Sequence, residues 1–303
     1  MKEIIGYIRK YLTQVNKKVF LLCSLQTAML IYLNYAHHLE KWITSSDILP
    51  WPQFSGHFLI FIFAFSLPYF FYWLIQKKNY FLNKPFAILV VVAAAIFALK
   101  MAPIANLPLS TDESWNEYWN QILYWPARVV ILTAILFLVW KSFDPEQPFY
   151  GLTTKNLNWR PYVLMLLIML PLVVAASTQK DFLMTYPKLQ TSLRATEGLG
   201  WFHKFLFELS YGTDFFSVEL FFRGFLILAF MKWVGKDAIL PMACFYCTIH
   251  FGKPLGECIS SYFGGLILGI VVYNTRSIWG GLMVHLGIAW LMEVGGFVGN
   301  AIK

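Results

Sequence analysis

Apolar residues fill most of this chain in long runs that short polar connections separate. Each run approaches the ~20 residues that a helix needs to cross the hydrocarbon core of a bilayer. The pattern therefore predicts an all-α fold, a polytopic transmembrane helical bundle of about eight to nine spans. The runs cover roughly residues 19–36, 57–75, 86–106, 121–140, 162–177, 205–231, 238–252, 258–275 and 278–299.

The composition supports a membrane protein and argues against nucleic-acid binding. Of 303 residues, 58% are hydrophobic and 13% are charged, whereas a soluble domain averages about 25% charged residues. The net charge is +8, but the basic residues lie mostly at the ends of the apolar runs. We therefore expect membrane lipids as partners, and no nucleic acid. The four cysteines lie in or beside apolar stretches, where cysteine acts as a small hydrophobe, so no disulfide is predicted.

The charges of the connections predict the orientation in the membrane. The loops at 76–85 and 141–161 are rich in lysine and arginine, whereas the connection at 107–120 is acidic and has neither. By the positive-inside rule the amino terminus and both basic loops face the cytoplasm. The basic segment 178–203 would then lie outside, against this trend. We expect an integral, multi-pass protein of a bacterial inner membrane.

Prolines divide the chain into two parts. The pairs Asp144-Pro145 and Arg160-Pro161 frame a proline-rich seam at 141–161. We therefore expect amino-terminal transmembrane helices in 1–150 and a transmembrane core in 151–303. Within the core, the run at 205–231 is too long for one perpendicular span, so it predicts either a tilted helix or two pieces broken near Gly212.

Four ionisable residues in the apolar runs of the core are candidates for a functional site. Charged and titratable groups are costly inside a membrane and usually serve a function there. Glu219 and Arg223 are four residues apart, which predicts a structural ion pair on one helical face. His250 and His285 lie in two further runs. Together with Glu219 they could form a zinc ligand set, or a glutamate and a histidine could activate water as general bases without metal. The spacing leaves zinc open, and no other cofactor is predicted.

Three motifs carry a resemblance to a known family. They are Val-Glu-Leu-Phe-Phe-Arg-Gly at 218–224, Tyr-Cys-Thr-Ile-His at 246–250 and His-Leu-Gly-Ile-Ala at 285–289. In order and separation they resemble Glu-Glu-x-x-x-Arg, Phe-x-x-x-His and His-x-x-x-Asn of the CAAX protease and bacteriocin-processing family of intramembrane proteases. The resemblance covers roughly residues 200–300 and implies that the core in 151–303 has the fold of these proteases.

The resemblance also implies roles for individual residues. In the family, the first glutamate and the first histidine activate the attacking water, while the second histidine and the asparagine hold the oxyanion. His250 and His285 match the two histidines, and Glu219 matches the second glutamate. The position of the first glutamate holds Val218, and that of the asparagine holds Ala289. Two of the four expected catalytic groups are therefore replaced by apolar residues.

Three other carboxylates are possible auxiliary groups. Asp214 lies one helical turn before Val218. Glu257 and Glu293 follow His250 and His285 by seven and eight residues, spacings that return to about the same face of an unbroken helix. Pro254 lies between His250 and Glu257 and threatens that continuity.

Two functions follow as hypotheses. The first is an intramembrane endopeptidase that uses Glu219, His250 and His285 to cut a peptide or protein substrate, with or without a lipid attached, near the membrane surface. The alternative is a catalytically impaired pseudoprotease that acts as a binding, scaffold or immunity protein, with a partner membrane protein. A transporter is less favoured, because the sequence shows neither inverted repeats nor paired broken helices.

Overall fold

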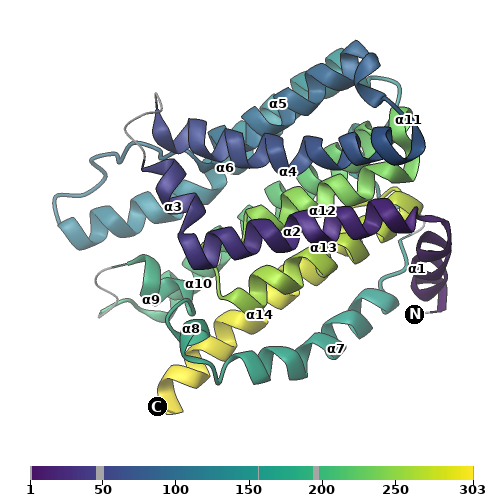
Figure 1. The fold of residues 1–303 in the computed structure, drawn as a ribbon. Coiled ribbons are helices and arrows are strands. Elements are labelled where there is room, and N and C mark those ends of the chain that lie inside the picture. Colours follow the sequence, from purple (N-terminus) through teal and green to yellow (C-terminus); the bar gives the residue numbers. More distant parts are fainter. Residues whose placement is uncertain (1, 46–50, 156, 194–197, 303) are drawn as a thin grey trace.

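The computed structural model describes residues 2–45, 51–155, 157–193 and 198–302, and all regular structure in these ranges is helical. Long helices run side by side to form a bundle, with short helices at its two ends (Figure 1). The predicted all-α membrane bundle is confirmed.

The helices are numbered in chain order. The amino-terminal part contains α1 (Lys2–Gln14), α2 (Lys17–His37), α3 (Leu39–Thr44), α4 (Pro52–Gln76), η1 (Tyr80–Leu82), α5 (Lys84–Met101), α6 (Glu113–Phe143) and η2 (Phe149–Gly151). The carboxy-terminal part contains α7 (Arg160–Ala176), α8 (Lys180–Leu183), α9 (Lys188–Ser192), α10 (Trp201–Glu219), η3 (Leu220–Ala229), α11 (Met231–Val234), η4 (Gly235–Ala238), α12 (Ile239–Thr248), α13 (Leu255–Thr275) and α14 (Trp279–Ile302).

Among the described residues, six helices are long and apolar enough to cross a membrane, namely α2, α4, α5, α6, α13 and α14. The shorter apolar helix α7, the continuous helix formed by α10 and η3, and the buried helix α12 account for the remaining predicted runs. Each predicted apolar run thus contains a helix, although the runs at 86–106 and 238–252 extend beyond the ends of α5 and α12. The largest difference in bounds is at α6, which begins at Glu113 rather than near residue 121, because the Asp112 side chain accepts a hydrogen bond from the Trp115 amide at 3.0 Å and caps it.

The long run at 205–231 forms one helix that is not broken at Gly212. α10 continues through this residue, where α14 packs closely. The helix instead changes its winding directly after Glu219, where η3 continues as a π-helix. Such wide turns are rare and often occur at functional sites. The change places Glu219 at the last α-helical turn and Arg223 within the π-helix.

The two parts of the chain share one apolar core. Phe61 of α4 packs on Phe245 of α12 with 4.8 Å between ring centroids. Tyr150 of η2, in the proline-rich seam, packs on Phe225 of η3 at 5.4 Å. Buried residues of both parts belong to the same hydrophobic cluster. The amino-terminal helices therefore help to hold α12 and η3, which carry part of the candidate site.

Ion pairs join the connections between helices at one end of the bundle. At one end Lys78 pairs with Asp237 at 2.8 Å and Lys232 pairs with Asp144 at 2.5 Å. This end also holds α1 and α11, whereas α3, α8, α9 and the carboxy terminus lie at the other end (Figure 1). The predicted basic loops thus gather at the end near the amino terminus.

Candidate functional site

The ion pair between Glu219 and Arg223 is completely buried. Arg223 Nη1 lies 3.2 Å from Glu219 Oε1, and both side chains are 0% exposed. Because a buried charge without a partner costs several kcal/mol, each residue of the pair depends on the other. The four-residue spacing on which the structural ion pair was predicted gives this contact.

His285 of α14 joins this pair from the neighbouring helix. Its Nδ1 lies 3.0 Å from Glu219 Oε1. A carboxylate only accepts hydrogen bonds, so Nδ1 carries the hydrogen and Nε2 is left to accept. Nε2 lies 3.1 Å from the hydroxyl of Tyr246, which donates to it. Glu219, His285 and Tyr246 therefore form a chain of carboxylate, imidazole and hydroxyl.

Tyr246 also connects this chain to His250. Tyr246 lies on α12, and His250 lies in the turn that follows this helix. His250 Nδ1 donates to the backbone carbonyl of Tyr246 at 3.1 Å, and the two ring centroids are 4.8 Å apart. Among the described residues, no hydrogen bond is formed by His250 Nε2. We call these five residues the histidine site: Glu219, Arg223, Tyr246, His250 and His285.

Sequence reasoning missed Tyr246 as a functional residue. The guanidinium of Arg223 lies over its ring, with Cζ 4.0 Å from the ring centroid, so the tyrosine contacts the ion pair as well as both histidines. The signal was a hydroxyl-bearing residue four positions before His250, where the family motif carries phenylalanine.

The two positions that depart from the family motifs are buried and apolar. Val218 is 6% exposed and Ala289 is 5% exposed. Within the described ranges, no carboxylate forms a recorded hydrogen bond or ion pair with the His250 side chain. Among the described residues, the imidazole of His250 is therefore oriented by one backbone carbonyl and by packing on the Tyr246 ring.

Asp214 is held by a lysine of another helix. Its Oδ1 pairs with Lys100 of α5 at 2.8 Å and accepts from the Ser217 hydroxyl at 3.1 Å. A carboxylate committed to a lysine of α5 is not free to serve His250. The lysine within the apolar run at 86–106 is the sequence signal that could have indicated this pair.

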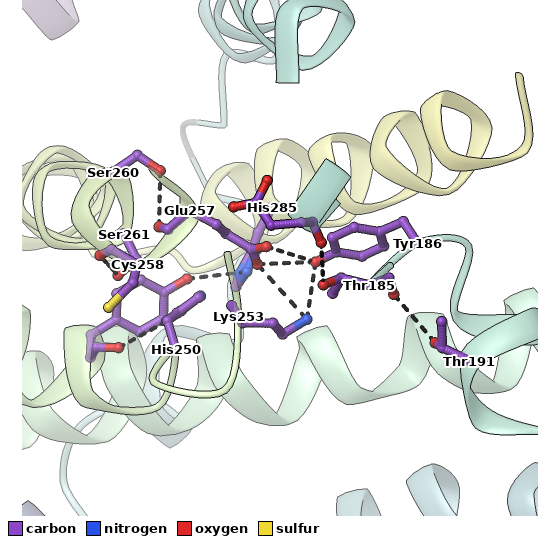
Figure 2. A network of polar contacts seen from close by, with 12 residues as sticks. Thr185, Tyr186, Thr191, His250, Lys253, Glu257, Cys258, Ser260, Ser261 and His285 are labelled. Atoms are coloured by element: carbon purple, nitrogen blue, oxygen red, sulfur yellow. Dashed lines mark hydrogen bonds and ion pairs between the residues drawn. The ribbon is translucent and has the colours of Figure 1, made fainter. Parts of the chain in front are cut away.

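Glu257 lies on a different helix from His250. α12 ends at Thr248 and α13 begins after Pro254, so the seven-residue spacing does not place the two residues on one helical face. Glu257 instead accepts from the Tyr186 hydroxyl, with 3.0 Å to each carboxylate oxygen. Lys253 Nζ donates to the same hydroxyl at 3.0 Å and lies 3.8 Å from Glu257 Oε1 (Figure 2). We call Tyr186, Lys253 and Glu257 the Lys253 cluster.

Glu293 shares a face of α14 with His285, because that helix is unbroken between them. Its Oε2 accepts from the backbone amide of Lys188 at 2.7 Å. Its Oε1 is buried and has no hydrogen-bond partner among the described residues. Glu293 thus attaches α9 to the core rather than contacting His285.

Burial also shifts the pKa values of side chains in the segment that Glu293 attaches to the core. The pKa of Lys188 is lowered to about 8, first because burial disfavours the ammonium and then because Lys253 is nearby. Burial raises the pKa of the Tyr186 phenol well above its usual range, and Glu257 adds to this effect. The connection that contains α8 and α9 therefore includes two ionisable groups with shifted pKa values.

The residues do not fit a zinc ion. Glu219 Oε1 already pairs with Arg223 Nη1 and accepts from His285 Nδ1, so this oxygen and the histidine nitrogen are engaged with each other rather than turned toward a common metal position. In the ranges that the structure describes, no group of three or more histidine, cysteine, aspartate or glutamate residues is placed to hold a metal.

The bundle and the histidine site define the class of the protein. It is an integral membrane protein in which a carboxylate, two imidazoles and a hydroxyl from α10, α12 with the turn after it, and α14 meet inside the helical bundle. The sequence model of a family described as type II CAAX prenyl endopeptidase Rce1-like matches residues 210–291, which is 82 of the 303 residues. This segment contains all three motifs, so the predicted resemblance to the CAAX proteases is confirmed there. No curated protein and no solved structure matches the chain.

Proposed function

We propose that the protein is an intramembrane endopeptidase that hydrolyses a peptide bond in a prenylated, membrane-bound peptide or protein. The observation that carries this proposal is the free Nε2 of His250, held beside the chain of Glu219, His285 and Tyr246. The family match over 210–291 supports a peptide bond as the target and a prenylated substrate.

The hydrolysis requires only a base and a donor. Because Nδ1 donates to the Tyr246 carbonyl, Nε2 of His250 is the nitrogen that takes a proton from water. The water oxygen attacks the carbonyl carbon of the substrate, and the carbonyl electrons move to the oxygen, which becomes an oxyanion. The oxyanion then collapses, the carbon–nitrogen bond breaks, and His250 returns the proton to the leaving amine. Peptide and water are consumed, and a carboxyl and an amino terminus form.

The replacement of the first glutamate makes this reaction slow. With Val218 at that position, His250 has no carboxylate to assist in removing the proton. General base catalysis contributes about 10²- to 10⁴-fold to a rate, and a backbone carbonyl orients the imidazole without adding charge. We expect turnover that is measurable over hours and faster in Val218→Glu.

The gathering of charged loops supports an orientation in the membrane. We propose that the amino terminus and the basic loops face the cytoplasm of a bacterium with the bundle in its inner membrane. The Lys253 cluster involves the connection that contains α8 and α9, at the opposite end of the bundle from α1 (Figure 1). His250 lies beside this cluster, because the backbone amide of Lys253 donates to its carbonyl at 3.0 Å. The substrate would therefore approach the histidine site from the outer side of the membrane, with its lipid among the membrane lipids.

The test is cleavage by the purified protein in liposomes. A farnesylated peptide is incubated with the wild-type protein, and fragments are identified by mass spectrometry. We expect cleavage that falls at least about 10²-fold in His250→Ala, because the base is removed. His203→Ala is the control, since His203 packs on Trp115 with 4.9 Å between ring centroids, outside the histidine site. No fragment from the wild-type protein, or equal rates in wild type and His250→Ala, would overturn the proposal.

A specific observation favours a second candidate function. Val218 and Ala289 are apolar, and no described carboxylate contacts the His250 side chain, which is the arrangement of a pseudoprotease that binds without cutting. In that case the His250→Ala variant, at normal expression, would keep the cellular role that complete deletion removes. Hydrolysis would then appear only in the double variant Val218→Glu/Ala289→Asn.

A further inference from the structure

Tyr246 contacts three of the four other residues of the histidine site. Its hydroxyl contacts His285, its carbonyl accepts from His250, and its ring lies under the guanidinium of Arg223. The family motif has phenylalanine at this position, which has no hydroxyl. We propose that the Tyr246 hydroxyl is the hydrogen-bond donor to the oxyanion and replaces the donor that is missing at Ala289.

The position of the missing donor and the Tyr246 hydroxyl both lie close to His285. Ala289 lies one helical turn after His285 on the same face of α14, and its methyl group donates no hydrogen bond. Tyr246 reaches the neighbourhood of His285 from α12 instead, with 3.1 Å between its hydroxyl and Nε2. A donor is therefore restored beside the second histidine of the motif, but it comes from a different helix.

The surroundings fix the position of this hydroxyl. Tyr246 is 4% exposed, and Arg223 Cζ lies 4.0 Å from its ring centroid. Gly265 of α13 packs so closely that a Cβ there would lie 2.7 Å from Cδ1 of the ring. The hydroxyl oxygen is therefore already in place, and only its hydrogen has to turn when charge develops, which keeps the reorganisation small, as effective oxyanion stabilisation requires.

Glu219 and His285 hold the Tyr246 hydroxyl ready for this role. Glu219 holds His285 through Nδ1, which leaves Nε2 as the partner of the hydroxyl in the absence of substrate. The hydroxyl turns about its carbon–oxygen bond to donate to the oxyanion when that charge forms. No proton leaves Tyr246. The new bond is charge-assisted and hence stronger than the neutral bond to His285 that it replaces.

The experiment rests on the proposed cleavage and compares four forms of the full-length protein in liposomes: wild type, Tyr246→Phe, Ala289→Asn and Tyr246→Phe/Ala289→Asn. We expect Tyr246→Phe to lower kcat by about 10²- to 10³-fold with little change in KM, although phenylalanine is the residue of the family motif. Asparagine at position 289 should restore most of the lost rate in the Tyr246→Phe background, because it supplies a donor beside His285. A purely structural tyrosine would not be rescued in this way.

Adjacent glycines provide a second, matched comparison. Gly265→Ala should displace the Tyr246 ring and lower kcat, whereas Gly264→Ala should leave it unchanged, because a Cβ at Gly264 meets nothing within 4 Å. Thermal unfolding of both variants shows whether they fold.

The possible outcomes separate the two proposals. A wild-type protein without activity overturns the proposed function, and the role of Tyr246 with it. An active wild-type protein with an equally active Tyr246→Phe overturns the role of Tyr246 alone. Loss of activity in Tyr246→Phe without rescue by Ala289→Asn also contradicts the replacement of one donor by the other.

Discussion

Glu219 serves two partners with one oxygen. Its Oε1 pairs with Arg223 and accepts from His285, while a Cβ at Gly281 would lie 2.6 Å from its Oε2. The carboxylate therefore neutralises a buried guanidinium and also orients an imidazole of the histidine site. Structural and functional roles of this residue are not separable by a single substitution.

The dependence of Glu219 and Arg223 on each other predicts the stability of their variants. Glu219→Leu leaves a buried guanidinium without its carboxylate and should reduce the free energy of unfolding by about 3–5 kcal/mol. Adding Arg223→Met removes the orphaned charge and should recover most of this loss. Denaturant unfolding in detergent micelles measures both variants. A double variant that is as unstable as the sum of the two single variants would contradict the account.

Sequence alone predicted the contact of Glu219 with Arg223, because four residues on a helix give the geometry directly. The motif resemblance predicted that the two histidines accompany this pair, and His285 does contact Glu219. The partner of His285 on α12 could not be predicted, since the hydrogen bond to Tyr246 joins two helices whose packing no local pattern specifies. For the same reason Asp214, which is held by Lys100 of α5, was expected to be available.

At the scale of elements, the apolar runs predicted where the helices lie but not the residues at which they begin and end. Caps decide where a helix begins, so Asp112 starts α6 before the apolar run and Pro254 starts α13 after a turn. The change of winding after Glu219 has no sequence signal that we recognise, although it places Arg223 in the π-helix. Helix type is set by packing around η3, which is completely buried.

The short helix α9 gives a pH-dependent prediction. Burial lowers the pKa of Lys188 from 10.5 to about 8 in the folded protein. Between about pH 8 and 10.5 the unfolded chain therefore binds more protons at this residue, and stability should rise with pH. Lys188→Met should remove this contribution. The variant should therefore have a higher midpoint of thermal unfolding than the wild type at pH 7.5, and this difference should disappear by pH 10. A constant difference between the two proteins over this range would contradict the prediction.

At the scale of the whole molecule, the proposed orientation is testable with cysteine labelling. Lys77 and Lys180 are exposed. Lys77 follows α4 in one of the basic loops, and Lys180 begins α8, which lies at the opposite end of the bundle from α1 and α11. In intact cells a membrane-impermeant maleimide should label Lys180→Cys, but should label Lys77→Cys only after permeabilisation. All four native cysteines are buried, so the wild-type protein serves as the unlabelled control. The reverse pattern would place the amino terminus outside.

The fold class and the order of helices were predictable because the membrane restricts the choice to helices of sufficient length. Their arrangement was not, since side chains far apart in sequence determine it. Tyr186 and Glu257, for example, are 71 residues apart and meet at 3.0 Å. Such contacts place the Lys253 cluster, and with it the connection containing α8 and α9, at one end of the bundle (Figures 1 and 2).

The central claim is that the histidine site still hydrolyses a peptide bond with water. The most direct measurement is cleavage of the farnesylated peptide in water labelled with heavy oxygen, followed by mass spectrometry of the new carboxyl terminus. We predict that one labelled oxygen enters the product with the wild-type protein, and that His250→Ala yields no labelled product above the background of peptide without protein. Intact, unlabelled peptide after prolonged incubation with the folded wild-type protein would contradict the account.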